Sequence, residues 1–334
     1  MNLETLRRPD ERGKAIKKWV TVFILSILFI IGSTEFGLAQ PDEKVRGEID
    51  NGKLYLDIGL KSGYLRGDTS YNISFAEGES ELKFPLKTFL LGIEGGWGYR
   101  NPQEQDKLRL SVKWLTNIDH GSGKMEDSDW IEGDGHPGLD IYSESDIESK
   151  AHIVDVNVIY NFWLIKQLSI GPIVGYRFQY FKYDVSNTDQ VGYGPWAPVA
   201  TVYVSGKTLN YKIEYHIPYF GLNSNVLFGK KLQANMRINY SPLTYARDRD
   251  DHLLRYKLSK GDTDGYAYIA SIDGTWNFLP NWSLTIGGEY LKIRTTGTQY
   301  QVFYGGPFIG TTYDVDDKIT SSQLFISAII SFRF

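Results

Sequence analysis

Cysteine is absent from the 334-residue sequence. This absence excludes disulfide bonds, thiolate catalysis and metal sites with cysteine ligands. The sequence also lacks a G-x-S-x-G motif, an H-E-x-x-H motif and a glycine-rich phosphate loop, and four of its histidines share no metal-ligand spacing: His120, His136, His152 and His216. The common signatures of serine hydrolases, zinc proteases and nucleotide-binding proteins are therefore missing.

Long hydrophobic runs are scarce as well. The one clear apolar stretch, Val20 to Ile31, is shorter than the roughly 20 residues that a membrane-spanning helix needs. Basic residues precede it, and Gly37-Leu38-Ala39 follows with the small residues of a cleavage site. We expect a signal peptide over residues 1–39 and a single domain over residues 40–334; the alternative is an uncleaved N-terminal anchor.

An excess of basic residues is lacking too. Without residues 1–39 the chain has 30 Lys and Arg against 36 Asp and Glu, a formal charge of −6. Such a balance argues against a nucleic-acid partner.

What the sequence does contain is alternation with a period of two. Apolar residues at every second position, with mostly polar or small residues between them, predict two-sided β-strands. The clearest runs are Leu54 to Leu60, Leu108 to Trp114, Val154 to Phe162, Tyr211 to Ile217 and Leu232 to Tyr240. Five weaker candidates bring the total to about ten: Leu82 to Ile93, Ile170 to Tyr180, Tyr266 to Phe278, Trp282 to Ile293 and Leu324 to Phe334.

The polar half of the strand from Leu232 to Tyr240 decides between fold classes. Gln233, Asn235, Arg237 and Asn239 would face inward, where a dry core would leave them unpaired. A barrel with a lipid-facing outside and a polar lumen accepts them. The alternative is a soluble β-sandwich or a secreted lectin-like domain.

Short and long connections between these strands alternate along the chain. The long segments are expected near Gly67 to Glu81, Asn117 to Lys150, Asp184 to Lys207, Ala246 to Asp264 and Thr295 to Lys318. Strict alternation places all of them on one side of the membrane, and in such barrels the long loops are extracellular. We therefore expect an all-β fold, a transmembrane antiparallel up-and-down β-barrel of about ten strands with long extracellular loops that carry the function.

Two of the long segments contain ionisable residues spaced two apart. Asp127 and Asp129 lie in one, and Asp248, Asp250 and His252 lie in the other. On an extended chain this spacing puts each set on one face, so strand extensions above the membrane would aim both sets across one groove. Asp250 can orient His252 as a general base, while two close aspartates would share a proton and hold one raised pKa. The alternative is that these acidic loops are solvated or bind Ca²⁺.

At these residues the sequence resembles the omptins, a family of outer-membrane endoproteases on ten-stranded barrels. The similarity is sharpest at Met125 to Trp130, His136-Pro137, Tyr211 to Leu222 and Asp248 to His252, and Gly59 to Gly63 is also similar. The resemblance implies that Asp127 and Asp129 are the catalytic aspartate couple and that Asp250 and His252 are the catalytic dyad. It further implies that a water between the two pairs attacks the peptide bond, with no metal and no covalent intermediate.

The resemblance also implies cleavage next to Arg or Lys, since Asp248 matches one acid of the pocket that receives the basic side chain. The second acid of that pocket is a glutamate in the family. Here it falls near Gly67, and Asp68 is the nearest candidate to replace it.

Lipopolysaccharide is the other partner that the resemblance implies, since many omptins bind it, and its presence is a candidate requirement for activity. The family holds it through a Tyr-x-Glu-x-Arg stretch and a further arginine, whereas the corresponding positions here are Tyr176, Phe178, Tyr180 and Glu214. Losing arginine removes bidentate recognition of phosphate, so we expect a weak or differently built lipid dependence.

The expected protein is thus a monomeric barrel in the outer membrane, with its active site facing the outside and polypeptides as substrates. A non-enzymatic surface barrel, either an adhesin or a protein that binds a cation such as Ca²⁺, is the alternative. A lipid-active barrel hydrolase is a third class, but no Ser–His constellation supports it.

Overall fold

The computed structural model describes residues 52–75, 78–101, 105–131, 138–229 and 231–334. The chain divides into two units, Met1–Gly52 and Lys53–Phe334, and nearly all described residues belong to the second. The expected signal peptide at residues 1–39, its boundary with a domain that starts at residue 40, and the His136-Pro137 match lie outside the described residues.

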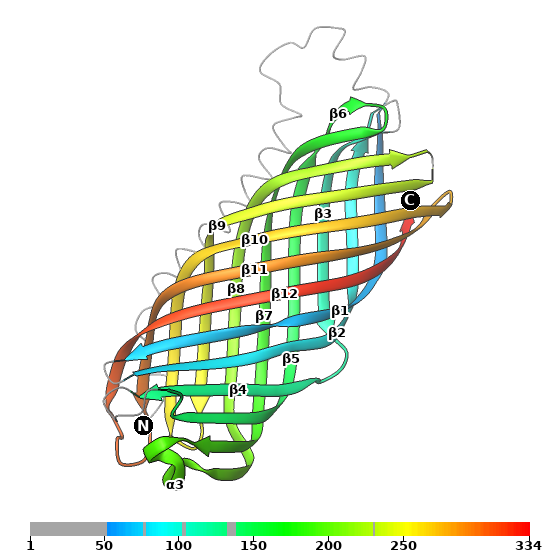
Figure 1. Ribbon diagram of the computed structural model, residues 1–334. Helices are drawn as coiled ribbons and strands as arrows, with labels where there is room; N and C mark the ends of the chain where they lie inside the picture. Colours follow the sequence, from blue (N-terminus) through cyan, green and yellow to red (C-terminus); the bar gives the residue numbers. More distant parts are fainter. Residues whose placement is uncertain (1–51, 76–77, 102–104, 132–137, 230) are drawn as a thin grey trace. The chain divides into compact units, whose positions relative to one another are not determined.

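Antiparallel strands make up almost all of the second unit (Figure 1). They are β1 (Lys53–Phe75), β2 (Gly78–Arg100), β3 (Asp106–Asn117), β4 (Gly121–Ile131), β5 (Ile141–Tyr160), β6 (Phe162–Ile165), β7 (Leu168–Gly192), β8 (Val202–Phe228), β9 (Leu232–His252), β10 (Lys257–Leu279), β11 (Trp282–Phe303) and β12 (Thr312–Arg333). Two short helical turns, η2 (Gly194–Trp196) and α3 (Ala197–Ala200), follow β7. Within the described ranges, no helix has the length and apolar character to cross a membrane.

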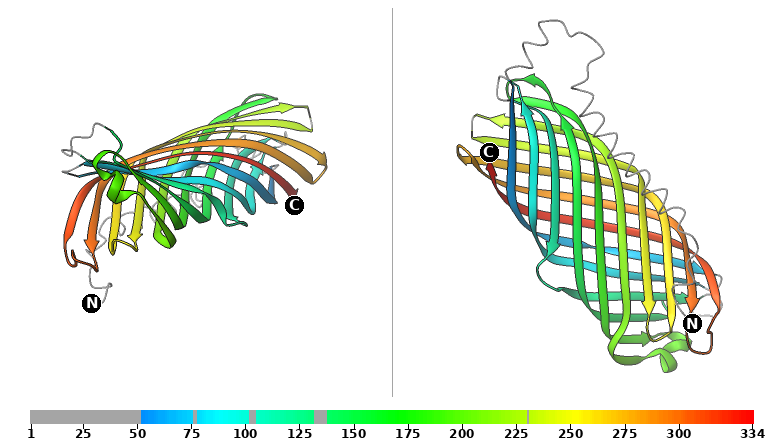
Figure 2. Two further views of the ribbon diagram at one scale, coloured as in Figure 1. Left: turned by 60° about the horizontal axis from the view of Figure 1, so that its bottom comes forward. Right: turned by 180° about the vertical axis from the view of Figure 1, so that it is seen from behind.

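The strands close into a ring in which β12 pairs with β1. Both β3 and β4 pair with β2 and with β5, so together they occupy one place in the wall. In the same way β5 and β6 both pair with β7. Twelve strands therefore occupy ten places, which confirms the expected barrel and its strand count, and the ring excludes an open sandwich. The oblique strands of this wall are visible from two sides in Figures 1 and 2.

An apolar belt covers the outside of one half of the barrel. In β1 the outward side chains of Leu54, Leu56, Ile58 and Leu60 are each about half exposed, and Met236 and Ile238 continue the belt on β9. Exposed leucine and isoleucine at every second position are what a lipid-facing wall requires. Above this belt the outward residues become charged, as at Arg66 on β1 and Arg249 on β9, so these parts of the strands project beyond the membrane.

Beyond the membrane, the apolar face of the strands points into the barrel. In β8 the apolar residues Tyr211, Ile213, Tyr215 and Ile217 are buried inside the barrel, with 0% exposure, and the polar residues between them face outward. Water replaces lipid around this half, so the same two-residue period now hides its apolar face.

The expected long loops are wrong in most of their length. The segment from Gly67 to Glu81 is almost entirely strand, because β1 continues to Phe75 and β2 begins at Gly78. Similarly, only residues 253–256 separate β9 from β10. The residues expected in loops therefore lie on rigid strand extensions.

Inside the membrane-spanning half, the lumen is polar. A cavity of about 930 Å³ is lined by many polar side chains, among them Gln233, Asn235, Arg237 and Asn239, as expected. Ion pairs cross this space, and Arg177 contacts both Asp155 and Glu289 at 2.6 Å. The lumen thus carries paired charges on the inside of a lipid-facing wall.

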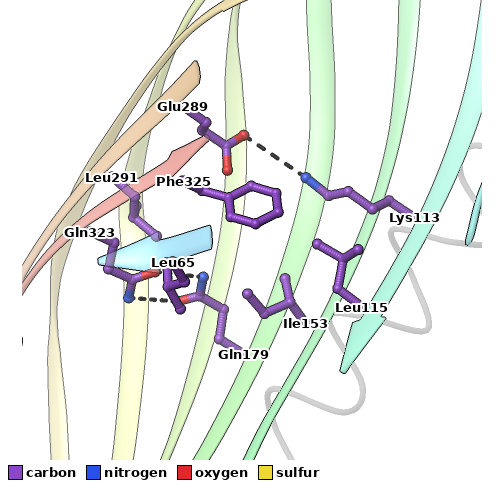
Figure 3. A pocket seen from close by; sticks show the side chains of 9 residues that line it. All are labelled: Leu65, Lys113, Leu115, Ile153, Gln179, Glu289, Leu291, Gln323 and Phe325. Atoms are coloured by element: carbon purple, nitrogen blue, oxygen red, sulfur yellow. Dashed lines mark hydrogen bonds and ion pairs between the residues drawn. The ribbon is translucent and has the colours of Figure 1, made fainter. Parts of the chain in front are cut away.

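A change from polar to apolar packing marks the upper limit of this lumen. Around a cavity of about 10 Å³, the Lys113–Glu289 ion pair and the reciprocal Gln179–Gln323 hydrogen bonds meet a cluster of apolar side chains (Figure 3). That cluster consists of Leu65, Leu115, Ile153, Leu291 and Phe325. A cavity of this size holds one water at most, so packed side chains separate the lumen from the half that projects beyond the membrane.

Candidate active site

The two sets of ionisable residues lie on the strand extensions. Asp127 and Asp129 belong to β4, while Asp250 and His252 are the last inward-facing residues of β9. Asp250 lies opposite Tyr211 of β8 and Ser259 of β10. Because alternate residues of a strand point to the same face, the spacing of two brings both members of each pair to the inside.

Asp250 and His252 form a direct pair. His252 Nε2 lies 2.8 Å from Asp250 Oδ2, and the Asp250 side chain is 1% exposed. The Tyr71 hydroxyl, which comes from β1, donates a hydrogen bond to the same oxygen. Burial alone would raise the pKa of Asp250, but the charge of His252 and these two hydrogen bonds outweigh burial and lower it. Asp250 is therefore a carboxylate at neutral pH.

His252 is held as a neutral base by the same surroundings. Burial lowers the pKa of its imidazole below 6.5, although the neighbouring Asp250 carboxylate acts in the opposite direction. With Nε2 directed at Asp250, Nδ1 is the ring nitrogen that can accept a proton. An imidazole in this state is suited to taking a proton from water.

The pKa of Asp127 is raised, whereas those of Asp250 and His252 are lowered. Burial, and next the charge of Asp129, raise the pKa of Asp127 to about 8. Ser80 Oγ on β2 donates a hydrogen bond to Asp127 Oδ1 at 3.4 Å. The expectation that one member of this couple holds a proton agrees with these surroundings.

Lys257, the first residue of β10, connects the two pairs electrostatically. Its side chain is buried, and burial lowers its pKa, whereas the charges of Asp250, Asp127 and Asp129 raise it. Asp250 in turn contributes to the raised pKa of Asp127. The acid couple and the dyad therefore act on each other across the barrel interior, with a cation close to both.

An aromatic layer supports the dyad from within. Phe84 and Tyr211 stack with ring centroids 4.3 Å apart, and Tyr71 and Tyr183 pack against them. All four rings are at most 1% exposed. This packing fixes the position from which the Tyr71 hydroxyl reaches Asp250.

The two residues expected in the substrate pocket are not brought together. Asp248 lies on β9, faces the interior two residues before Asp250 and is 2% exposed. On β1, Thr69 points inward to the Tyr215 hydroxyl; by strand alternation Gly67 also faces inward, and the half-buried Asp68 faces outward. Asp68 is therefore not placed beside Asp248.

Sequence reasoning missed Tyr71 and Lys257. A tyrosine in a strand that precedes Asp250 by 179 residues has no local signature of an active-site position. Lys257 carries a weak signal, since it follows His252 by five residues and a tight connection returns the chain beside it.

The residues at the positions expected to contact lipopolysaccharide lie on the outer wall. Tyr180 lies opposite Glu214, and Phe178 lies opposite His216. The Tyr176 hydroxyl shares a hydrogen bond of 2.6 Å with His216 Nδ1. These contacts make an aromatic surface with a carboxylate at its edge.

Comparison with known proteins identifies the family of this chain. The model of the omptin family matches residues 80–334, which include both ionisable pairs and Asp248. A plasminogen activator from Yersinia pestis is 22% identical over 196 residues, which cover 55% of this chain and 59% of that relative, less than two thirds of its length. The crystal structure of the outer membrane protease OmpT from Escherichia coli has the same fold, with a TM-score of 0.72, 14% identity, and coverage of 84% of this chain and 97% of that one. Since the family model matches well over half of the sequence, this chain belongs to the omptin family.

Proposed function

We propose that this protein is an outer-membrane endopeptidase that hydrolyses extracellular polypeptides next to basic residues. One observation carries the proposal: His252 Nε2 lies 2.8 Å from the buried Asp250 carboxylate, and Asp250 acts electrostatically on Asp127 of the second pair. Membership of the omptin family and the shared fold with a protein named as an outer membrane protease support the location and the class of reaction.

The dyad would activate water. Neutral His252 takes a proton from the water, whose oxygen then bonds to the scissile carbonyl carbon. The Asp250 carboxylate stabilises the imidazolium that forms. General-base assistance of this kind contributes about 10²- to 10⁴-fold to a rate.

The acid couple would complete the reaction. The proton that Asp127 holds at neutral pH can be donated to the amine nitrogen as the C–N bond breaks, and the proton on His252 is then released to solvent. Asp129 keeps the pKa of Asp127 raised, so the couple regains one proton for the next cycle. No covalent bond between enzyme and substrate is needed in this sequence.

The lengths of the connections support the proposed orientation in the membrane. The end that carries the site also carries the longer segments at residues 193–201 and 304–311, whereas the other end has tight turns such as residues 280–281. Longer connections are extracellular in outer-membrane barrels, so the site faces the outside. We propose a weak dependence on lipopolysaccharide, because the outer-wall positions of the family's lipid site hold Tyr176, Phe178, Tyr180 and Glu214.

A peptide-library digest tests the proposal. The chain from residue 40 to residue 334 is refolded and incubated with basic and neutral peptides, with and without lipopolysaccharide, and with EDTA present. Mass spectrometry reads the cut sites. Cuts beside Arg or Lys that vanish in Asp250→Asn support the proposal, whereas no cleavage with or without lipid favours a non-enzymatic binding barrel.

A further inference from the structure

Two buried carboxyl groups meet below the dyad, and only one of them belongs to the expected pocket. Asp248 on β9 and Asp317 on β12 are each 2% exposed. Two strands, β10 and β11, lie between theirs in the wall. The carboxyls nevertheless converge, since a methyl group at Gly261 of β10 would overlap both Asp248 Oδ1 and Asp317 Oδ2.

Glycine makes this convergence possible. Gly261 lies opposite Asp248 on the neighbouring strand, and Gly297 of β11 lies opposite Asp317. Gly261 has no side chain to fill the inner face, so the two carboxyls approach each other over its bare backbone, whereas a methyl group at Gly297 would meet the Asp262 backbone instead. We call the space over Gly261 between the Asp248 and Asp317 carboxyls the acidic recess.

The recess lacks a positive partner. Among the described residues, no donor makes a hydrogen bond of good geometry to any of the four carboxyl oxygens, although the Gly261 amide and the Tyr211 hydroxyl approach Asp248 and the Lys318 amide approaches Asp317. Burial raises the pKa of Asp317 to about 7, and burial together with the charge of Asp317 raises the pKa of Asp248. Buried acceptors without donors are costly and rare, so their presence points to a ligand that supplies the donors.

The two carboxyl groups of the recess favour a cationic ligand. Two carboxyls that share one space bind an ammonium or guanidinium group, which neutralises them and donates several hydrogen bonds. The recess also adjoins the proposed catalytic Asp250, which follows Asp248 by two residues on the same face of β9 and whose charge helps to raise the pKa of Asp248. On the neighbouring strand β1, the position of the family's second pocket acid is Gly67, which offers no carboxyl.

We propose that Asp317 is a specificity-determining residue that, together with Asp248, forms the acidic floor of the pocket for the Lys or Arg side chain of the substrate. The proposal rests on the endopeptidase function proposed above. Asp317 supplies from β12 the second negative charge that β1 lacks.

The test compares peptide pairs that differ only by Arg or its neutral isostere citrulline at the cut position. Asp317→Asn keeps the shape of the side chain, and we expect it to lower kcat/KM for the Arg peptide by about 10- to 100-fold, the range for losing a hydrogen bond to a charged group. Cleavage of the citrulline peptide should stay within a factor of about 3. Asp316→Asn, an exposed neighbour with the same charge change, should alter neither. An equal loss on both peptides in Asp317→Asn would overturn the proposal.

A binding measurement separates this proposal from the catalytic one. Agmatine carries the guanidinium group without a peptide bond, and calorimetry reads its binding to the folded barrel. We expect binding to wild type and to Asp316→Asn, and a loss of at least 10-fold in affinity in Asp317→Asn and in Gly261→Ala, which fills the recess but keeps both carboxyls. Agmatine binding without any peptide cleavage would refute only the proposed function, while equal agmatine binding by wild type and Asp317→Asn would refute the pocket.

Discussion

The Tyr71 hydroxyl donates its hydrogen bond to Asp250 Oδ2, the same oxygen that lies 2.8 Å from His252 Nε2. Two strands that are far apart in the sequence, β1 and β9, thus hold one carboxylate in place. Tyr71 is fixed in turn by the aromatic packing with Phe84 and Tyr211. This arrangement makes Tyr71 a positioning residue for the dyad.

Removing that hydroxyl should move the acid side of the pH profile. Its hydrogen bond helps to lower the pKa of Asp250, so in Tyr71→Phe the carboxylate becomes protonated at a higher pH and adds to the acid limb that the protonation of His252 sets. We expect kcat to fall about 10-fold at neutral pH, as the loss of a hydrogen bond to a charged group implies, and the acid limb of kcat/KM to shift upward. If kcat/KM falls by the same factor at every pH and its acid limb does not shift, Tyr71 serves packing alone.

The two perturbed groups of the site predict a bell-shaped pH dependence. Activity should rise with pH as His252 loses its proton, at a pKa below 6.5, and should fall above pH 8 or so as Asp127, with a pKa of about 8, loses the proton it donates. In Asp127→Asn the amide cannot titrate, so the weak remaining activity should lose its alkaline limb. Persistence of that limb in Asp127→Asn would assign it to another group.

Substrate preference separates Asp248 from Asp68. Asp248→Ala should lower kcat/KM for Arg and Lys peptides by about 10-fold or more, with a smaller effect on neutral peptides, because it removes a buried carboxyl from the recess. Asp68→Asn should change neither, because strand alternation puts Asp68 on the outer face. Kinetics on matched peptides measure both. If Asp68→Asn has the larger effect on basic peptides, the outward placement of Asp68 is contradicted.

The sequence was informative about the barrel for a physical reason. A wall between lipid and a polar lumen demands strict alternation, as at Leu232 to Tyr240, and this pattern is visible in the chain without any knowledge of its partners. Above the membrane the interior is apolar and the outer face is wet, so the alternation at Tyr211 to Ile217 still marks a strand, although its apolar side faces inward. In Gly67 to Glu81 and in Ala246 to Asp264, polar and charged residues outnumber apolar ones, so the sequence predicts loops where the strands in fact continue.

The candidate site, too, could be predicted only in part from the sequence. Asp127, Asp129, Asp250 and His252 could be found because each pair is local, with a spacing that strand geometry brings to one face. Asp317 could not be found, because it meets Asp248 only when the ring closes, and the glycine that admits both carboxyls has no signature of its own. Asp68 was predicted as a pocket residue because it follows Gly67 directly in the sequence. Neighbouring residues of a strand point to opposite faces, so Gly67 faces the inside of the barrel and Asp68 faces the outside.

The charged lumen should contribute to stability independently of activity. Arg177 is 3% exposed and neutralises both Asp155 and Glu289, so Arg177→Met leaves the buried Asp155 carboxylate without its cation and leaves Glu289 with Lys113, at 3.9 Å, in place of the closer arginine. We expect a loss of about 3–5 kcal/mol in the free energy of unfolding, measured by urea unfolding in lipid vesicles. Lys182→Met, which breaks a partly exposed pair with Asp184, should cost less than about 1 kcal/mol. Equal losses in the two variants would contradict this account of the lumen.

The most direct test of the central claim is the cleavage of an Arg-containing peptide by wild type, Asp250→Asn and His252→Ala, each first verified as a folded, heat-modifiable barrel on a gel. The account predicts cleavage beside Arg in wild type and a loss of at least about 10²-fold in both variants. Cleavage that is unaltered in both folded variants would contradict the assignment of the water-activating dyad.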